Sequence, residues 1–169
     1  MTTNAAADKD TVADKIAALG LTLPAPMQLP PGVVAKFPFV RIIGNRALVS
    51  GHGPLNADGT LATNLFGTVG QDIDMEQATR AAQLTTLALL SSLKSELGSL
   101  DRITAFGRVM GMVNSAPDFT AQTPVIDAFS ELVNQVFTAD VAAHSRAAVG
   151  MASLPMGMSV EIEAEVYFE

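Results

Sequence analysis

The chain has 169 residues, of which 49% are hydrophobic and 16% are charged, and its net charge at pH 7 is −7. This length suits one domain with a sizeable core. The ten basic residues are scattered, which argues against a broad nucleic-acid-binding surface. The lack of cysteine excludes disulfides, thiolate catalysis and zinc–thiolate sites. The low charged fraction favours a homo-oligomer, which would cover surplus apolar surface.

The first 32 residues are expected to form a polar tail, a short helix and an irregular arm. Residues 1–9 are polar, and DTVADKIAAL has apolar residues at helical spacing between a capping Asp10 and a terminating Gly20. Four prolines in LTLPAPMQLPPG favour an extended arm. We expect no secretory signal, and the apolar segment 81–93 is too short to cross a bilayer. A cytoplasmic protein without membrane contact is therefore predicted.

Residues 33–169 are expected to form the main domain. The segment VVAKFPFVRIIGNRALVSGHGPL predicts two strands joined at Gly44 and Asn45, because both residue types tolerate the backbone of a tight hairpin. A short strand or an extended piece is also expected within LATNLFGTVG, residues 61–70.

Two long helices with a strand between them are predicted next. Asp74 and Gln77 form a capping box, and Gly98 can end the helix that they open. The strand covers residues 103–116, and its two glycines indicate a bulge or a close approach. The second helix carries Pro124 in its first turn. With two strands near the C-terminus, this order predicts an α+β domain with helices on one face of one sheet.

The C-terminal stretch HSRAAVGMASLPMGMSVEIEAEVYFE predicts two strands around LPMG. Apolar and acidic residues alternate, so Glu161, Glu163 and Glu165 share one face. Like charges on one face repel unless a cation is near. Arg146, expected on the neighbouring strand, is a candidate, and its planar fork suits either a glutamate or a substrate acid. A salt-bridged exposed hairpin and the lining of a site explain this pattern equally well.

Other catalytic chemistry has little support in the residues. The two histidines, His52 and His144, have no carboxylates at metal-ligand spacing, and we expect neither metal nor cofactor. The segment SGHG, residues 50–53, could bring backbone N–H groups close to an anion or could simply be a turn. A two-histidine ribonuclease is an alternative that the net charge disfavours.

The segments GNRALVSGHGPL, APDF and SRAAVGMASLPMGMSVEIEAEV together resemble the RidA/YjgF family, also called L-PSP endoribonucleases. The specific pattern is R-x-x-V-x-x-x-x-L-P-x-x-x-x-V-E-I-E, from Arg146 to Glu163. The resemblance covers residues 33–168, and the N-terminal helix and arm are similar to a longer branch. It implies a chorismate-mutase-like α+β fold, a barrel-like homotrimer, and ligand clefts between subunits. It also implies hydrolysis of 2-imino or enamine acids to 2-keto acids and ammonia, without a cofactor.

The resemblance implies a role for each matching residue. Arg146 matches the arginine that clamps the substrate carboxylate, and Glu161 matches the glutamate that positions or activates water. The implied lining of the cleft adds five positions: Phe37, Ser50, Gly51, His52 and Ala148.

Three departures from the family pattern keep alternatives open. Phe37 stands where many deaminases have a tyrosine, Ala148 replaces a cysteine, and Asp127 is a poor substitute for a helix asparagine. Besides a trimeric imine/enamine deaminase, a non-catalytic keto-acid-binding protein would use the same cleft. An endoribonuclease is the third hypothesis, and the net charge argues against it. Structural or interface roles are expected for Glu163 and Glu165.

Overall fold

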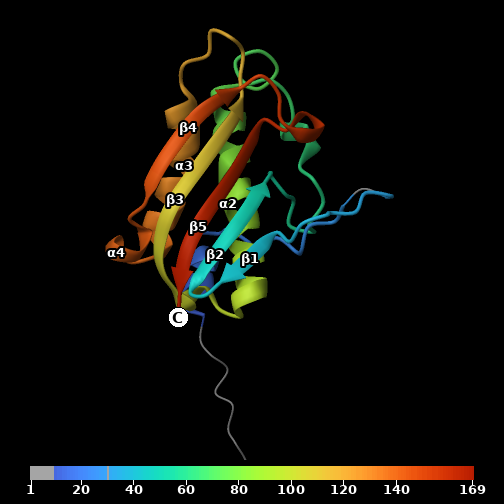
Figure 1. The fold of residues 1–169 in the computed structure, drawn as a ribbon. Helices are drawn as coiled ribbons and strands as arrows, with labels where there is room; N and C mark the ends of the chain where they lie inside the picture. Colours follow the sequence, from blue (N-terminus) through green and yellow to red (C-terminus); the bar gives the residue numbers. More distant parts are fainter. Residues whose placement is uncertain (1–9, 30) are drawn as a thin grey trace, which may run out of the picture.

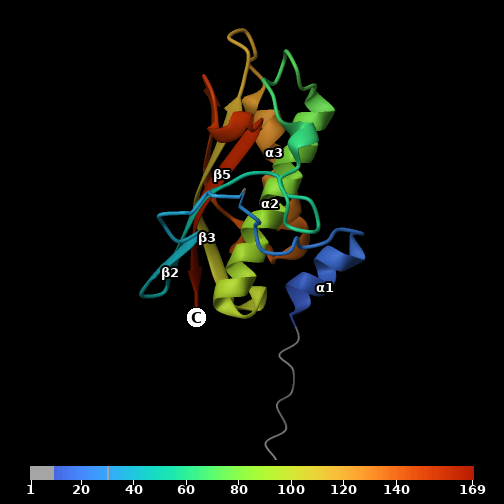
Figure 2. The ribbon, with the colours of Figure 1, turned by 90° about the vertical axis from the view of Figure 1, so that its right-hand side faces the viewer.

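The computed structural model describes residues 10–29 and 31–169, so the expected tail at residues 1–9 lies outside the described residues. A single five-stranded sheet has the order β1-β2-β5-β3-β4 (Figure 1). Helices α2 and α3 cover one face, and α1 lies on the far side of α2 from the sheet (Figure 2). The predicted α+β arrangement is confirmed. The elements are α1 (Thr11–Ala18), β1 (Val40–Ile43), β2 (Arg46–His52), η1 (Thr63–Leu65), α2 (Met75–Leu97), η2 (Leu100–Arg102), β3 (Ile103–Asn114), α3 (Gln122–Val136), α4 (Ala139–Ala142), β4 (Ser145–Met151), η3 (Pro155–Gly157) and β5 (Val160–Phe168).

The hairpin of β1 and β2 is as predicted, with antiparallel pairing from Val40 opposite Val49 to the turn at Gly44, whose φ is 61°. Of the short strand or extended piece expected within residues 61–70, the strand does not form. This segment contains the short 3-10 helix η1 instead, and the chain turns at Gly67 and Gly70, which both have positive φ. An extended strand cannot run through two such residues.

The two long helices are confirmed. At the start of α2, Asp74 Oδ1 accepts from the Gln77 N–H at 2.8 Å, while Gln77 Oε1 accepts from the Asp74 N–H at 3.1 Å. Gly98 ends this helix with φ 85°. Pro124 lies in the first turn of α3, where its missing N–H has no helical partner to lose. In residues 10–29 and 31–169, no helix is long and apolar enough to span a membrane.

Strand β3 shows both effects that its glycines predicted. The register against β5 shifts between Phe106 and Val109, around Gly107. Gly111 lies directly under α3, where an added Cβ would stand 2.6 Å from side-chain carbons of Ile126. The missing side chain therefore lets helix and sheet approach more closely than any other residue would allow.

The expected C-terminal hairpin is wrong. Strands β4 and β5 both form, but β3 lies between them, parallel to β4 and antiparallel to β5. The connection through η3 is long enough to cross the end of β3. It contains Met156 at φ 57°, an uncommon backbone for a residue with a side chain. The predicted alternation in β5 is confirmed, since its helix-facing residues are buried: Val160, Ile162, Ala164 and Val166.

The N-terminal helix is part of the core. Val12 and Ile16 are 5% and 1% exposed and belong to the main hydrophobic cluster. Asp10 caps α1 as predicted, accepting from the Ala13 N–H at 3.1 Å. The arm that follows crosses the domain before it reaches β1. The boundary placed between residues 32 and 33 stays a prediction.

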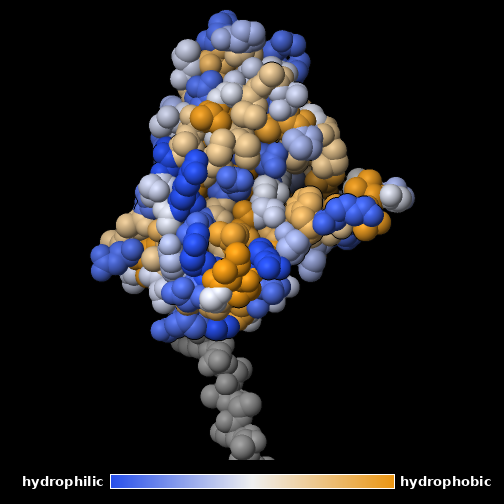
Figure 3. All heavy atoms as spheres, viewed as in Figure 1, coloured by the Kyte–Doolittle hydropathy of each residue, from blue (hydrophilic) through white to orange (hydrophobic). Residues whose placement is uncertain are grey.

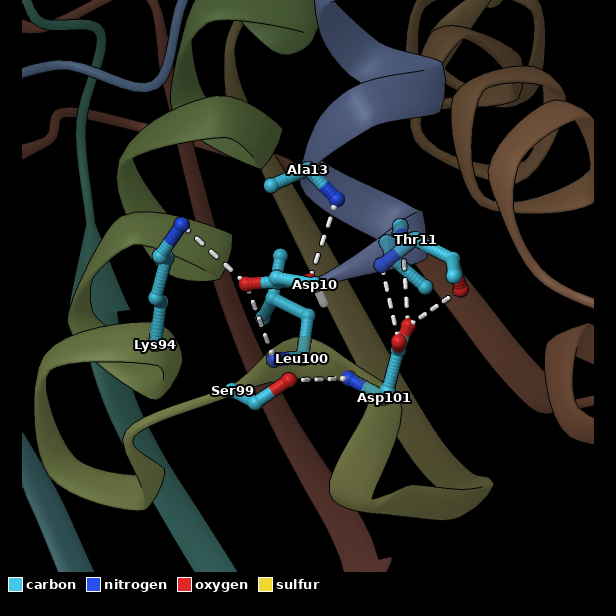
Figure 4. Close-up of polar contacts among 8 residues, drawn as sticks. Asp10, Thr11, Ala13, Lys94, Ser99, Leu100 and Asp101 are labelled. Carbon is cyan, nitrogen blue, oxygen red and sulfur yellow. Dashed lines mark hydrogen bonds and ion pairs between the residues drawn. The ribbon is translucent and has the colours of Figure 1, made fainter. Parts of the chain in front are cut away.

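Figure 4 shows how polar contacts attach α1 to the segment after α2. The carboxylate of Asp101 accepts from the Thr11 N–H at 2.7 Å, the Thr11 hydroxyl at 2.8 Å and the Val12 N–H at 3.0 Å. Asp10 forms an ion pair with Lys94 at 3.1 Å. Asp101 thus serves the first amides of α1 as an additional cap.

Replacing Asp101 tests this attachment. We expect Asp101→Ala to lower the free energy of unfolding by about 1–2 kcal/mol, because the first amides of α1 lose their acceptor. Urea denaturation followed by circular dichroism measures the change. Asp118→Ala, at an exposed aspartate, is the matched control and should stay close to wild type. Equal stability of both variants would show that the contact contributes nothing.

Candidate functional site

Arg146 is held by three contacts to α3. It pairs with Val109 in the sheet and points to the helix-covered face. Its NH2 group lies 2.7 Å from Asp127 Oδ1, and NH1 donates to Ser130 Oγ at 2.7 Å and to the Ile126 carbonyl at 3.1 Å. The Arg146 side chain is only 15% exposed, whereas that of Asp127 is 46% exposed. The guanidinium is therefore fixed in one orientation.

His144 extends this network. Its Nδ1 lies 2.6 Å from the carbonyl of Ala142, and its Nε2 lies 2.9 Å from Ser130 Oγ. Since a carbonyl only accepts, Nδ1 carries hydrogen, and Nε2 of the neutral ring accepts the Ser130 hydroxyl hydrogen. That orientation leaves Ser130 Oγ free to accept from Arg146. The tautomer of His144 thus supports the position of the arginine.

An open hollow of about 430 Å³ lies over this network. It is bounded by α3, α4 and the beginning of β4, and its volume suits a small molecule. No group of acidic and histidine side chains in residues 10–29 and 31–169 could hold a metal ion. The residues around the hollow are Asp127, Ser130, Asn134, Ala142, Ala143, His144 and Arg146.

Glu161 lies on the opposite, open face of the sheet. Its carboxylate rests against Gly51, where an added Cβ would be 1.8 Å from Glu161 Oε1. This contact lies at a bulge of β2 between Val49 and His52. Burial, and secondarily the charge of Glu163, raise the pKa of Glu161. The structure thus places a carboxylate that is easier to protonate beside a glycine backbone.

Ser50 lies on β2, the strand that pairs with the strand of Glu161, and Phe37 lies in the arm that precedes β1. The Ser50 N–H donates to the Phe39 carbonyl and its hydroxyl donates to the Pro38 carbonyl, both at 2.9 Å. Phe37 is 56% exposed, and its ring packs edge-on against Phe39 at 5.8 Å. These contacts hold the end of the arm against β2. The Phe37 ring is left available for contact with another surface.

His52 points away from Glu161. It is 1% exposed and lies between the sheet and α2, with Nδ1 2.7 Å from the Ser50 carbonyl and Nε2 2.8 Å from Ser92 Oγ. Burial lowers the pKa of His52, an effect that the hydrogen bond to Ser50 partly offsets. Any role of His52 toward a ligand would therefore be exerted through the backbone of residues 50 and 51.

The candidate residues form two separate groups within one chain. Arg146 and Ala148 face the helices, while Glu161 faces away from them. Met112 of β3 pairs with Glu161 on one side and with Val149 on the other, so Glu161 lies two strand spacings, about 10 Å, from Val149. Arg146 lies three residues, about another 10 Å, along β4 from Val149. The structure does not bring Arg146 and Glu161 together. The second group consists of Glu161 with Ser50 and Gly51 of the neighbouring strand, whereas His52 points toward α2 and Phe37 packs on Phe39 in the arm.

Of the two partners left open for Arg146, a glutamate of β5 in the same chain is contradicted, because β3 separates the two strands. On the acidic face, Arg46 of β2 lies 2.8 Å from Glu165, and Arg108 of β3 lines a hollow together with Glu163 and Glu165. Hydrogen bonds from Arg46, and then from Tyr167, lower the pKa of Glu165. Glu165 thus has a structural partner, and Glu163 is exposed.

Sequence reasoning missed Ser130 and gave His144 no role at the site. Asp127, Ser130 and Asn134 recur at intervals of three and four residues, which indicates one polar face of α3. That spacing was a usable signal for a polar lining. The contact with Arg146 had no such signal, because it depends on how α3 crosses β4.

No family model matches the chain. Protein TCP17 of Trypanosoma cruzi is 34% identical over 155 residues, covering 92% of each protein. The solved structure of the Agrobacterium tumefaciens protein Atu1372, described as of unknown function, is 37% identical, with a TM-score of 0.84 over 95% of this chain and 94% of that one.

Two other solved structures show the same fold at lower identity. A candidate endoribonuclease of Shewanella oneidensis MR-1 is 23% identical, with a TM-score of 0.84 over 94% of this chain and 99% of that one. Escherichia coli TdcF with bound serine is 18% identical, with a TM-score of 0.55 over 88% of this chain and 96% of that one.

The fold defines a class of small proteins in which one sheet carries two long helices on one face, as in the chorismate-mutase-like L-PSP proteins. TCP17 and Atu1372 are members of one family with this chain. That fold, with the motif from Arg146 to Glu163, identifies the family: the chain belongs to the RidA/YjgF, L-PSP endoribonuclease-like proteins.

The raised pKa of Glu161 predicts a pH-dependent stability. An ionised Glu161 costs free energy in the folded state above its folded pKa, and the cost vanishes below the ordinary value of 4.5. We expect Glu161→Gln to raise the Tm by about 1–2 °C at pH 7.5, discounted for partial exposure. The gain should disappear as the pH falls toward 4.5.

Scanning calorimetry at several pH values measures the difference in Tm between wild type and Glu161→Gln. Glu163→Gln, two residues along the same strand, is the control and should gain less because its carboxylate is exposed. If the gain in Tm of Glu161→Gln instead increased as the pH fell, the raised pKa assigned to Glu161 would be contradicted.

Proposed function

We propose that the protein binds a small carboxylate at a subunit boundary and hydrolyses reactive 2-imino or enamine acids to 2-keto acids and ammonia. The observation that supports this most directly is the fixed guanidinium of Arg146 beside an open hollow. A pre-oriented arginine can hold a carboxylate without losing side-chain freedom on binding. Action in the cytoplasm stays a prediction from composition.

The site requires two copies of the chain, since Arg146 and Glu161 lie on opposite faces of one sheet. A homotrimer, as the family resemblance implies, would place Glu161 of one copy beside Arg146 of another. The open face supports association because apolar side chains surround its acidic band (Figure 3). These half-buried residues are Leu48, Met110, Met112, Ala147 and Val149.

The arm offers a further contact. Val33, Val34 and Phe37 are 52%, 69% and 56% exposed, and the arm projects beyond the domain beside β1 (Figures 1 and 3). Exposed apolar side chains on a projecting segment are typical of interfaces. In the proposed oligomer, Phe37 would border the cleft of a neighbouring copy.

The proposed reaction needs no group beyond the two copies, water and the substrate. Arg146 binds the carboxylate and aims the iminium carbon. Glu161 orients water and takes a proton as the C–O bond forms. Glu161 then gives this proton to the nitrogen, the C–N bond breaks, and ammonia leaves. As the C=O bond forms, the hydroxyl proton passes to Glu161, which then releases it to ammonia or water and becomes a carboxylate again. The raised pKa of Glu161 suits this alternation.

A non-catalytic binding protein is the second candidate. Phe37 offers no hydroxyl to the reacting atoms, and TdcF was solved with serine bound, so a protein of this fold can hold an amino acid. The same clamp would then bind a keto acid or another carboxylate without turnover. Ribonuclease activity has least support, because the basic residues form no patch in the sequence.

Replacing Arg146 tests the proposed clamp. We expect Arg146→Ala to lower kcat/KM for a 2-imino acid about 100-fold or more, because the substrate loses its orientation. The imino acid is generated in situ by a pyridoxal-phosphate enzyme, and keto-acid formation is followed. Arg146→Lys should also be impaired, since it keeps the charge but loses the fork.

Arg80→Ala, on α2 and outside both groups, is the control variant and should retain activity. Wild type that is stabilised by keto acids without accelerating hydrolysis would support the binding protein instead. Neither stabilisation nor hydrolysis with any carboxylate would contradict both candidates.

Mixing two inactive variants tests whether the site is shared between copies. Arg146→Ala and Glu161→Gln should each be inactive alone. Random co-assembly should restore about a quarter of the wild-type sites, because some boundaries then combine an intact Arg146 with an intact Glu161. A mixture as inactive as its components, despite confirmed exchange of subunits, would contradict the shared site.

A further inference from the structure

The guanidinium of Arg146 already has a carboxylate from its own chain. Asp127 Oδ1 lies 2.7 Å from NH2, while NH1 is directed to Ser130 and the Ile126 carbonyl. Among the described residues, no hydrogen bond engages Arg146 Nε or Asp127 Oδ2. The side chain of Asp127 is 46% exposed at the hollow, so a bound molecule can reach it.

This pairing changes what the hollow can bind well. With one positive and one negative group in contact, the Arg146–Asp127 pair has no net charge. A simple carboxylate that approaches Arg146 is repelled by Asp127 at close range, and the repulsion is strong in a partly desolvated site. A ligand that brings a cation beside its carboxylate satisfies both members of the pair instead.

We propose that Asp127 makes the site selective for acids with a positively charged nitrogen on the carbon next to the carboxylate. This ligand class comprises α-amino acid zwitterions and 2-imino acids in the protonated, iminium form. The carboxylate binds at Arg146 and the nitrogen donates to Asp127. The inference rests on the proposed function, since it requires that Arg146 binds the ligand carboxylate.

The geometry matches this ligand class. One carbon separates the two charged groups of an α-amino acid, and the complementary groups of the protein are likewise in direct contact at 2.7 Å. In the part of the chain that the structure describes, Arg146 Nε has no hydrogen-bond partner, so in this proposal the Nε edge receives the ligand carboxylate. A keto-acid product lacks a cation that would offset the charge of Asp127, so Asp127 repels it. This repulsion adds to the selectivity for acids with a charged nitrogen. A hydrolase with this pair would bind its substrate better than its product.

The test compares L-alanine with pyruvate, which have the same carbon number and differ in the nitrogen. Titration calorimetry with wild type should give tighter binding of L-alanine. Asp127→Asn should lower the ratio of the two affinities at least tenfold, by weakening L-alanine while leaving pyruvate unchanged or tighter. Asp127→Ser, a second variant that also removes the charge, should act in the same direction.

Glu131→Gln is the matched control, because it removes the same charge one turn further along α3 and should leave the ratio unchanged. Folding of each variant is verified by circular dichroism. A ratio that Asp127→Asn leaves as in wild type, or that Glu131→Gln lowers equally, overturns the role of Asp127. Tighter binding of pyruvate than of L-alanine by wild type also overturns it.

Binding by Arg146→Ala distinguishes failure of the selectivity proposal from failure of the proposed function. If Arg146→Ala abolishes binding of both ligands while Asp127→Asn leaves the ratio unchanged, the carboxylate clamp stands and only the selectivity proposal fails. If wild type binds neither ligand, or Arg146→Ala binds both as well as wild type, the proposed function and the selectivity proposal both fail.

Discussion

The close approach of α3 to the sheet at Gly111 determines the arginine half of the candidate site. Any side chain at this position would meet Ile126 at less than van der Waals distance, so either the Ile126 side chain or the helix that carries it would have to shift. The Ile126 carbonyl accepts from Arg146, and Asp127 and Ser130 follow on the same helix. Gly111 has no contact with the guanidinium of Arg146, yet it influences whether the three contacts of that guanidinium with α3 can form.

The strand order has an equally direct effect on function. Because β3 lies between β4 and β5, Arg146 and Glu161 of the RidA/YjgF motif lie on opposite faces of the sheet. They are close in the sequence but distant in one folded chain. If the proposed function holds, a single chain folds completely and still contains only two half-sites. In the proposed function, association is a chemical requirement as well as a way to cover apolar surface.

Local signals in the sequence were sufficient for most elements. The capping box of Asp74 and Gln77, the glycine stop at Gly98 and the alternation in β5 each depend on a few neighbouring residues. The neighbour of a strand depends instead on distant parts of the chain, which is why the hairpin of β4 and β5 was wrong. The ion pair of Arg146 with Asp127 could not be predicted for the same reason. The strand expected at residues 61–70 failed because two glycines adopt backbone angles that the apolar pattern does not reveal.

The contact between Gly51 and Glu161 has a consequence for how this protein can diverge. A residue with a Cβ at position 51 would occupy the space of the Glu161 carboxylate. A Cβ at position 51 would therefore force the end of the Glu161 side chain away from its present place beside the backbone. Substitution of the glycine would be tolerated first where the acid has been shortened or lost. The two positions should co-vary among homologues, and a chain that has lost this glycine would also have given up the carboxylate in its present place.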